Sequence, residues 1–127
     1  MKQAPSSKRR LFRVLSRADK PTFEAPEIYG RKAIQNIART LPPVERAYAN
    51  IRFSILRSKL LSVMDLLLPD EGRILDIGCG FGLFAAYFGQ TQPRREILGL
   101  DPNERRIKMA EHVASSLGLH QHKFIAA

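Results

Sequence analysis

The stretch that decides the fold is residues 72–89, which read GRILDIGCGFGLFAAYFG. Its first part, Arg73–Ile77, is a short apolar run of the kind that forms a buried strand. A loop with three glycines follows, and residues 83–88 then have a helix-like composition, with Gly89 placed to end the helix. The stretch therefore predicts a strand that passes through a glycine loop into a helix. Such a loop lets the backbone approach a ligand closely.

The sequence after this unit predicts two further strands and one more helix. Residues 96–100 are a second buried-strand pattern, which ends at Asp101, and residues 102–104 open a helix that stops at Gly118. Residues 122–127 then have the pattern of a third strand. Alternating strands and helices favour an α/β fold with a parallel sheet and right-handed crossovers.

The residues around the loop indicate which ligand it suits. The third glycine of a dinucleotide fingerprint would fall at position 83, where this chain has leucine, so nicotinamide binding is disfavoured. Asp76 lies two residues before Gly78, and Asp101 lies 19 residues after Gly82. An acid at that distance can hold both hydroxyls of an adenosine ribose. Two carboxylates also suit a ligand with a net positive charge.

The pattern DIGCGFG over residues 76–82, with Asp101 at the end of the next strand, resembles class I S-adenosylmethionine-dependent methyltransferases. The resemblance implies a Rossmann-like three-layer parallel sheet, with S-adenosyl-L-methionine as the cofactor. It also implies a set of cofactor-binding residues: Asp76 for the ammonium, Gly78, Cys79, Gly80, Phe81 and Gly82 along the methionine part, Asp101 for the ribose hydroxyls, and Pro102 and Asn103 near the adenine.

The single cysteine, Cys79, excludes an internal disulfide and a cysteine-based zinc site. The three histidines have no spacing typical of a metal site, so no metal is expected. None of them is positioned in the sequence to activate Cys79, and we assign this residue no nucleophilic role.

Upstream of the strand–loop–helix unit, residues 23–69 are predicted to form a helical extension. A short helix is expected over residues 29–41, and a long one from Pro43 to about Leu68. The long helix has an apolar stripe made of Phe53, Leu56, Leu60, Val63, Met64 and Leu67, widened by Ile51 and Ile55. We interpret the extension as packing on the sheet or lying over the cofactor pocket, with four candidate lining residues: Tyr29, Tyr48, Arg52 and Phe53.

The charge is concentrated in the N-terminal half of the chain. The net charge is +9, and residues 1–70 alone carry 14 basic and 6 acidic side chains. Residues 1–22 form a basic tail that we interpret as mostly disordered. A basic amphipathic helix at a membrane surface or on nucleic acid, or an organelle transit peptide, remains an alternative. No apolar run approaches the roughly 18 residues of a membrane span.

The resemblance covers about residues 70–127 of a chain of 127 residues, which is the first half of the family's seven-stranded sheet. We therefore expect a domain that is truncated after about its third strand, in which Arg73–Ile77 is an exposed apolar edge. Catalytic residues would lie beyond Ala127, so none is assigned. Because the substrate wall is missing, residues 1–127 alone are expected to show no turnover.

The resulting hypothesis is a cytoplasmic S-adenosylmethionine-dependent methyltransferase, with association at the periphery of a membrane as an open alternative. A small-molecule or lipid-like acceptor is favoured by the amphipathic tail and the apolar long helix. An RNA acceptor ranks second, because the basic N-terminus suits phosphates but has no interleaved aromatic residues. A non-catalytic nucleotide-binding or interaction module is the third interpretation.

Overall fold

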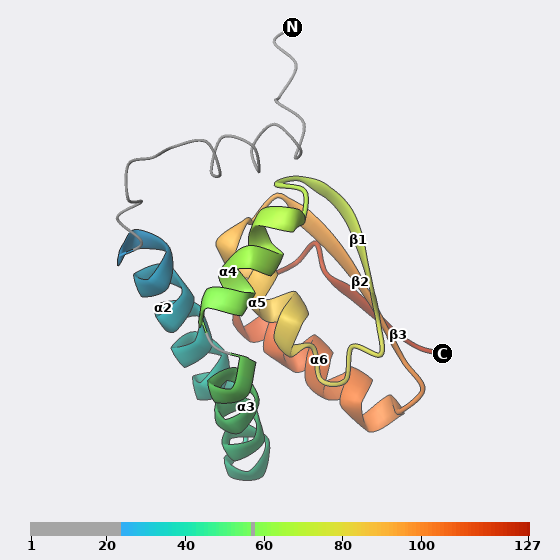
Figure 1. Cartoon of the computed structure of the whole chain (residues 1–127). Helices are drawn as coiled ribbons and strands as arrows, with labels where there is room; N and C mark the ends of the chain where they lie inside the picture. The colour runs from blue at the N-terminus through green and yellow to red at the C-terminus, as the bar shows by residue number, and fades with distance from the viewer. Residues whose placement is uncertain (1–23, 57) are drawn as a thin grey trace, which may run out of the picture.

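The computed structural model describes residues 24–56 and 58–127, so the basic tail predicted over residues 1–22 lies outside the described residues. A helical extension precedes a strand–helix alternation (Figure 1). The elements in chain order are α2 (Glu24–Thr40), α3 (Pro43–Leu56), α4 (Ser58–Leu67), β1 (Gly72–Ile77), α5 (Leu83–Thr91), β2 (Arg95–Asp101), α6 (Glu104–Ser116) and β3 (Lys123–Ala126).

The three strands form one parallel sheet in the order β1-β2-β3. Gly72 pairs with Arg95 at one end of the β1–β2 ladder, and Asp101 pairs with Ala126 in the β2–β3 ladder. All three strands lie within one or two residues of their predicted positions. The predicted fold class, a Rossmann-like parallel sheet with a helical extension, is confirmed.

Both connecting helices cover the same face of this sheet. The two crossovers, from β1 to β2 and from β2 to β3, run in the same direction across the sheet. Because both are right-handed, α5 and α6 lie on the same side of the sheet, where they contact each other. Side chains that face these helices are buried, such as Ile97 and Phe124. On the opposite face Leu75, Ile77 and Ile125 are 55, 77 and 50% exposed.

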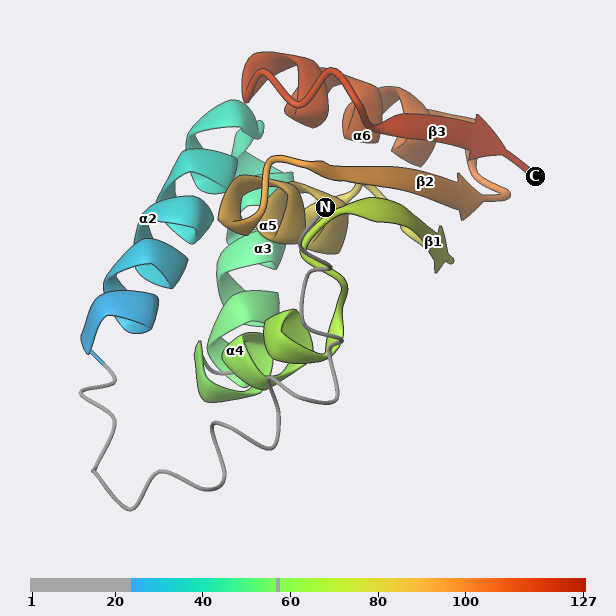
Figure 2. The ribbon, with the colours of Figure 1, turned by 90° about the horizontal axis from the view of Figure 1, so that it is seen from above.

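Helix α2 lies beside α5 and completes the core on the helical side of the sheet (Figure 2). Ile37 is fully buried in this contact, and the Asn36 side-chain amide donates to Gln90 Oε1 over 3.0 Å. A Cβ at Gly30 would lie only 2.7 Å from the Tyr87 hydroxyl oxygen. Glycine at this position therefore allows the close approach of the two helices.

The prediction of one long helix from Pro43 to Leu68 is wrong, because the structure has two helices, α3 and α4, in this range. Phe53 on α3 and Leu61 on α4 are both buried. At about 100° per residue, positions eight residues apart point roughly 80° away from each other on one straight helix. Separate helices let both side chains face the core. Several residues of the predicted stripe are exposed instead: Ile51, Ile55, Leu60, Val63 and Leu67.

The prediction that Gly89 ends the helix after the glycine loop is wrong, because α5 continues to Thr91. A Cβ at position 89 would collide with the imidazole of His122. That ring is held in place, since its Nε2 lies 3.0 Å from the Ala85 carbonyl oxygen. Gly89 is therefore a packing position inside the helix.

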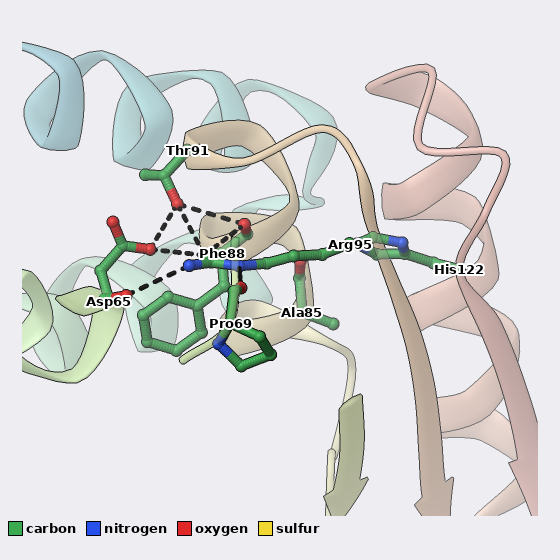
Figure 3. A network of polar contacts seen from close by, with 7 residues as sticks. All are labelled: Asp65, Pro69, Ala85, Phe88, Thr91, Arg95 and His122. Atoms are coloured by element: carbon green, nitrogen blue, oxygen red, sulfur yellow. Dashed lines mark hydrogen bonds and ion pairs between the residues drawn. The ribbon is translucent and has the colours of Figure 1, made fainter. Parts of the chain in front are cut away.

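One buried arginine joins the helical extension to the sheet (Figure 3). Arg95 begins β2, and its side chain has no exposed surface. Its guanidinium forms an ion pair with Asp65 of α4, and it donates to the carbonyl oxygens of Pro69 (2.6 Å) and Phe88 (3.0 Å). Nothing in the local sequence pattern around Arg95 indicates that its side chain is buried, because the burial comes from tertiary contacts.

Candidate functional site

The loop between β1 and α5 has a backbone that requires glycine. The φ angles of Gly78, Gly80 and Gly82 are 74°, 57° and 77°, in the left-handed region that other residues rarely adopt. The loop is fixed to β2, because the backbone N–H groups of Gly78 and Cys79 both donate to the Leu100 carbonyl oxygen, over 2.7 and 3.0 Å. The loop is thus a rigid connection at the carboxyl end of the first strand.

Asp101 joins this loop to the start of α6. Its Oδ2 accepts a hydrogen bond from Gly80 N (3.0 Å), and its Oδ1 accepts one from Asn103 N (2.9 Å). The residue is only 5% exposed. A carboxylate oxygen has more than one acceptor direction, so these bonds leave capacity for a ligand hydroxyl.

A cavity of about 380 Å³ lies beside the loop and Asp101. It sits at the carboxyl ends of the parallel strands, which is where open α/β sheets bind ligands. The structure brings five of the predicted site residues together around it: Gly78, Cys79, Gly80, Phe81 and Asp101.

Helix α3 supplies a second wall of this cavity. Val44, Glu45, Tyr48 and Arg52 border it, and the Tyr48 ring lies 5.5 Å from the ring of Phe81 in the loop. Tyr48 and Arg52 were candidates from the sequence, whereas Val44 and Glu45 were not. The spacing of 44, 48 and 52 puts these positions on one face of a helix, and this signal could have found Val44.

Of the two other candidates from the extension, Phe53 does not border the cavity. Phe53 is 5% exposed and packs in the core, with its ring centroid 6.1 Å from that of Tyr87. The side chain of Tyr29 lies outside the described part of the chain.

The three glycines of the motif have two different structural roles. A Cβ at Gly78 or Gly80 would meet no atom within 4 Å, so these positions leave open space beside the cavity. A Cβ at Gly82 would lie 3.0 Å from Ala110 Cβ and 3.3 Å from the Phe124 ring. Gly82 therefore serves the packing of the loop against α6 and β3, and it does not border the cavity.

Asp76 has a carboxyl oxygen without a partner. Among the described residues, none forms a hydrogen bond with its buried Oδ2. Burial raises the pKa of this carboxyl above its ordinary value of 3.8. Asp76 borders an apolar groove next to the cavity. Phe84 of α5 borders both the groove and the cavity. The free oxygen is suited to a cationic donor from a ligand.

The surroundings of Cys79 favour the protonated form of its thiol. Burial raises its pKa to about 11, and the negative charges of Asp76 and Asp101 add to the effect. The thiol is therefore protonated at neutral pH, and the thiolate needed for nucleophilic attack is scarce.

Pro102 and Asn103 follow Asp101 but do not border the cavity. The Asn103 side-chain oxygen accepts hydrogen bonds from the backbone N–H groups of Arg105 (3.0 Å) and Arg106 (3.2 Å). It is the N-cap of α6. The structure thus gives Asn103 a role in orienting the helix beside the site.

These features fit S-adenosylmethionine. Its ammonium matches the unpartnered oxygen of Asp76, and its ribose hydroxyls match the remaining acceptor capacity of Asp101. The open space at Gly78 and Gly80 allows the backbone to contact the methionine part. In the part of the chain that the structure describes, no group of three metal-ligating side chains occurs, and no helix is long and apolar enough to cross a membrane.

Relatives by sequence are methyltransferases. Ribosomal RNA small subunit methyltransferase G of Psychrobacter cryohalolentis is 41% identical over 57 residues, which are 45% of this chain and 24% of that protein. Ribosomal RNA small subunit methyltransferase C of Klebsiella pneumoniae is 27% identical over 100 residues, 78% of this chain and 28% of that protein. The chain thus spans about a quarter of the length of these relatives.

A solved structure with a similar fold is coclaurine N-methyltransferase bound to N-methylheliamine and S-adenosylhomocysteine. The TM-score is 0.50 at 18% identity, and the match covers 95% of this chain and 42% of that one. A family model described as "Methyltransferase domain" matches residues 48–126, which include Tyr48 and Arg52 of the cavity wall as well as the glycine loop. The chain therefore belongs to the methyltransferase-domain family, whose cofactor is S-adenosylmethionine.

Proposed function

We propose that this chain holds the cofactor-binding part of an S-adenosylmethionine-dependent methyltransferase. The observation that carries the proposal is the unpartnered Oδ2 of Asp76 beside a glycine loop whose open side faces a cavity. When bound, the cofactor supplies an electrophilic methyl group on a sulfonium. The chain's own residues bind and orient it: Asp76 accepts from the ammonium, and Asp101 accepts from the ribose.

Binding measurements on Asp76→Asn test this proposal. The substitution keeps the shape of the side chain but removes the charge, so we expect the affinity for S-adenosylmethionine to fall about 10- to 100-fold, as for loss of a charge-assisted hydrogen bond. Wild-type affinity should also fall as the pH is lowered through the raised pKa of Asp76, because the protonated carboxyl no longer attracts the ammonium. The variant should not show this pH dependence.

Isothermal titration calorimetry with S-adenosylmethionine and S-adenosylhomocysteine measures both effects. Glu111→Gln is the matched control, because it removes one negative charge from the exposed surface of α6. Equal affinity in wild type and Asp76→Asn would remove Asp76 from the site. A wild-type chain that binds neither ligand would instead favour a non-catalytic interaction module.

For the acceptor, we propose a small apolar or lipid-like molecule. Four exposed apolar side chains follow one face of α3 at helical spacing: Val44 (77% exposed), Tyr48 (53%), Ile51 (60%) and Ile55 (69%). The first two also border the cavity. An exposed apolar surface that leads into a cofactor cavity offers an apolar acceptor a path to the reacting methyl group.

RNA is the second candidate, and the names of the relatives support it. Both bacterial relatives described above are ribosomal RNA methyltransferases. The 57-residue match covers less than half of this chain and about a quarter of that relative. The basic excess in residues 1–70 adds weight to this candidate through phosphate contacts.

Two probes distinguish the acceptors. We expect cis-parinaric acid, a fluorescent fatty acid, to bind the chain and to bind the double variant Val44→Ser/Ile55→Ser more weakly. A fluorescently labelled ribosomal RNA fragment, titrated at two salt concentrations, tests the other candidate. Tight, salt-sensitive RNA binding without binding of the fatty acid would replace the lipid-like acceptor with RNA.

A further inference from the structure

A second cavity, of about 690 Å³, lies at the amino ends of the strands. Its walls come from α2, α4, the end of α5 and the turn after α6. Leu83 at the start of α5 borders the cavity beside the glycine loop, whereas Gln90 and Thr91 at the end of α5 border the second one. The two cavities share no lining residue, and the volume of the second suits a small molecule.

Hydrogen bonds between α2 and α5 hold one wall of the second cavity in place. The Gln90 side-chain nitrogen donates to the carbonyl oxygens of Ala33 (3.2 Å) and Ala86 (3.1 Å). The Gln90 side-chain oxygen accepts from the amide of Asn36. Because these bonds lie within the chain, the wall is formed before any ligand binds, as is usual for small-molecule sites.

Tyr87 presents a hydroxyl group to this cavity. The residue is only 2% exposed, because its ring packs against the rings of Phe53 and Phe88. Within residues 24–56 and 58–127, the Tyr87 oxygen has no hydrogen-bond partner, and it is not one of the fully enclosed atoms. Burial and the negative charge of Asp65 raise the pKa of Tyr87, so the hydroxyl keeps its proton at neutral pH. It is therefore a free donor in a largely dry place, where a polar ligand group would satisfy it.

Two opposite charges border the cavity, one on α4 and one on α2. Asp65 of α4 uses its Oδ1 for the Thr91 hydroxyl (2.7 Å) and for Arg95. The other carboxylate oxygen of Asp65 points away from both partners (Figure 3). Lys32 of α2 is exposed, and no ion pair joins it to another residue in the described ranges. Much of the remaining lining is apolar and includes Leu66, Leu117 and Leu119.

We propose that the second cavity binds a small zwitterion with an apolar body, of the kind represented by a large apolar amino acid. The outward oxygen of Asp65 accepts from the ammonium, while Lys32 and the Tyr87 hydroxyl bind the carboxylate. The leucine side chains receive the apolar body. Because the cavity shares no residue with the cofactor cavity, this inference does not depend on the proposed function.

Three ligands that differ by one group test the proposal. Phenylalanine is the zwitterion, phenethylamine lacks only the carboxylate, and 3-phenylpropionate lacks only the ammonium. We expect phenylalanine to bind about 10-fold more tightly than 3-phenylpropionate, as for loss of a charge-assisted hydrogen bond. Its advantage over phenethylamine should be about 2- to 5-fold, because Lys32 is an exposed partner.

Nuclear magnetic resonance titrations of the nitrogen-15-labelled full chain measure these affinities and locate the ligand. The side-chain amides of Asn36 and Gln90 and the backbone amide of Gly118 report on the second cavity, since all three residues border it. The amides of Gly78 and Gly80 report on the cofactor cavity. Binding at the two places is therefore distinguished in one experiment.

Three variants complete the test. Tyr87→Phe removes only the hydroxyl and should weaken phenylalanine about 3- to 10-fold. Lys32→Gln should weaken phenylalanine about 2- to 5-fold and leave phenethylamine unchanged. Lys108→Gln removes an equal charge from an exposed position on α6, away from the cavity, and should bind like wild type.

Four results would overturn the proposal. These are no binding of phenylalanine, amide shifts confined to residues outside the second cavity, an analogue that binds as tightly as phenylalanine, and equal effects of Lys32→Gln and Lys108→Gln.

Discussion

At the scale of single residues, two arginines next to each other in the sequence have opposite environments. The side chain of Arg95 is fully buried and bonded to Asp65, Pro69 and Phe88. The side chain of Arg94 is 73% exposed, and its guanidinium nitrogen lies 3.6 Å from a carboxylate oxygen of Glu71 in a surface ion pair. Sequence pattern does not separate them, since they are adjacent arginines directly after Pro93. Only the tertiary contacts show which one stabilises the fold.

Replacement of each arginine by methionine measures this difference. We expect Arg95→Met to lower the free energy of unfolding by about 3–5 kcal/mol, because Asp65 loses its charged partner and the carbonyl oxygens of Pro69 and Phe88 lose a buried donor. Arg94→Met should change it by less than about 1 kcal/mol, as is usual for exposed ion pairs. Urea denaturation followed by circular dichroism gives both values. Similar losses in the two variants would contradict the structural role of Arg95.

At the scale of elements, the sequence placed the strands better than the helix boundaries. Strand positions follow from apolar runs, and the loop from its glycines, both of which are local signals. The break between α3 and α4 and the continuation of α5 past Gly89 depend on what each helix packs against. Local propensity for helix or turn cannot report those contacts.

Gly89→Ala tests why the helix tolerates a glycine. In an isolated helix, alanine is more favourable than glycine by about 1 kcal/mol. Here we expect the substitution to destabilise the chain by about 1–3 kcal/mol, because the new methyl group overlaps the imidazole of His122. In a His122→Ala background, the same substitution should be stabilising. Thermal denaturation of the wild type, the two single variants and the double variant checks this. An effect of Gly89→Ala with the same sign in both backgrounds would contradict the packing explanation.

At the scale of the whole molecule, the described chain has an apolar sheet surface that its own helices do not cover. β1 pairs only with β2 among the described residues, and Leu75, Ile77 and Ile125 project from the face opposite α5 and α6. The exposed edge expected from the sequence is therefore present in the described structure. Apolar sheet faces and free edges favour association between chains.

Sedimentation velocity over a concentration series tests this surface. We expect the wild-type chain to self-associate and Ile77→Lys to shift it towards monomer, because a charge on the bare face opposes burial of that face. Val63→Lys is the control, since Val63 is a 51% exposed apolar residue on α4. A wild-type chain that remains monomeric at every concentration, or an equal effect of both variants, would show that the sheet face does not drive association.

The sequence by itself determined the parallel α/β architecture, the glycine loop and the acids Asp76 and Asp101, because these depend on periodicity, backbone freedom and spacing along the chain. Only the tertiary structure decided which residues share the cavity. It brought Tyr48 and Arg52 of α3 to the loop, and it turned Gly82 into a packing residue. The physical reason is that contacts between segments far apart in the chain depend on how helices pack, and packing depends on the whole core.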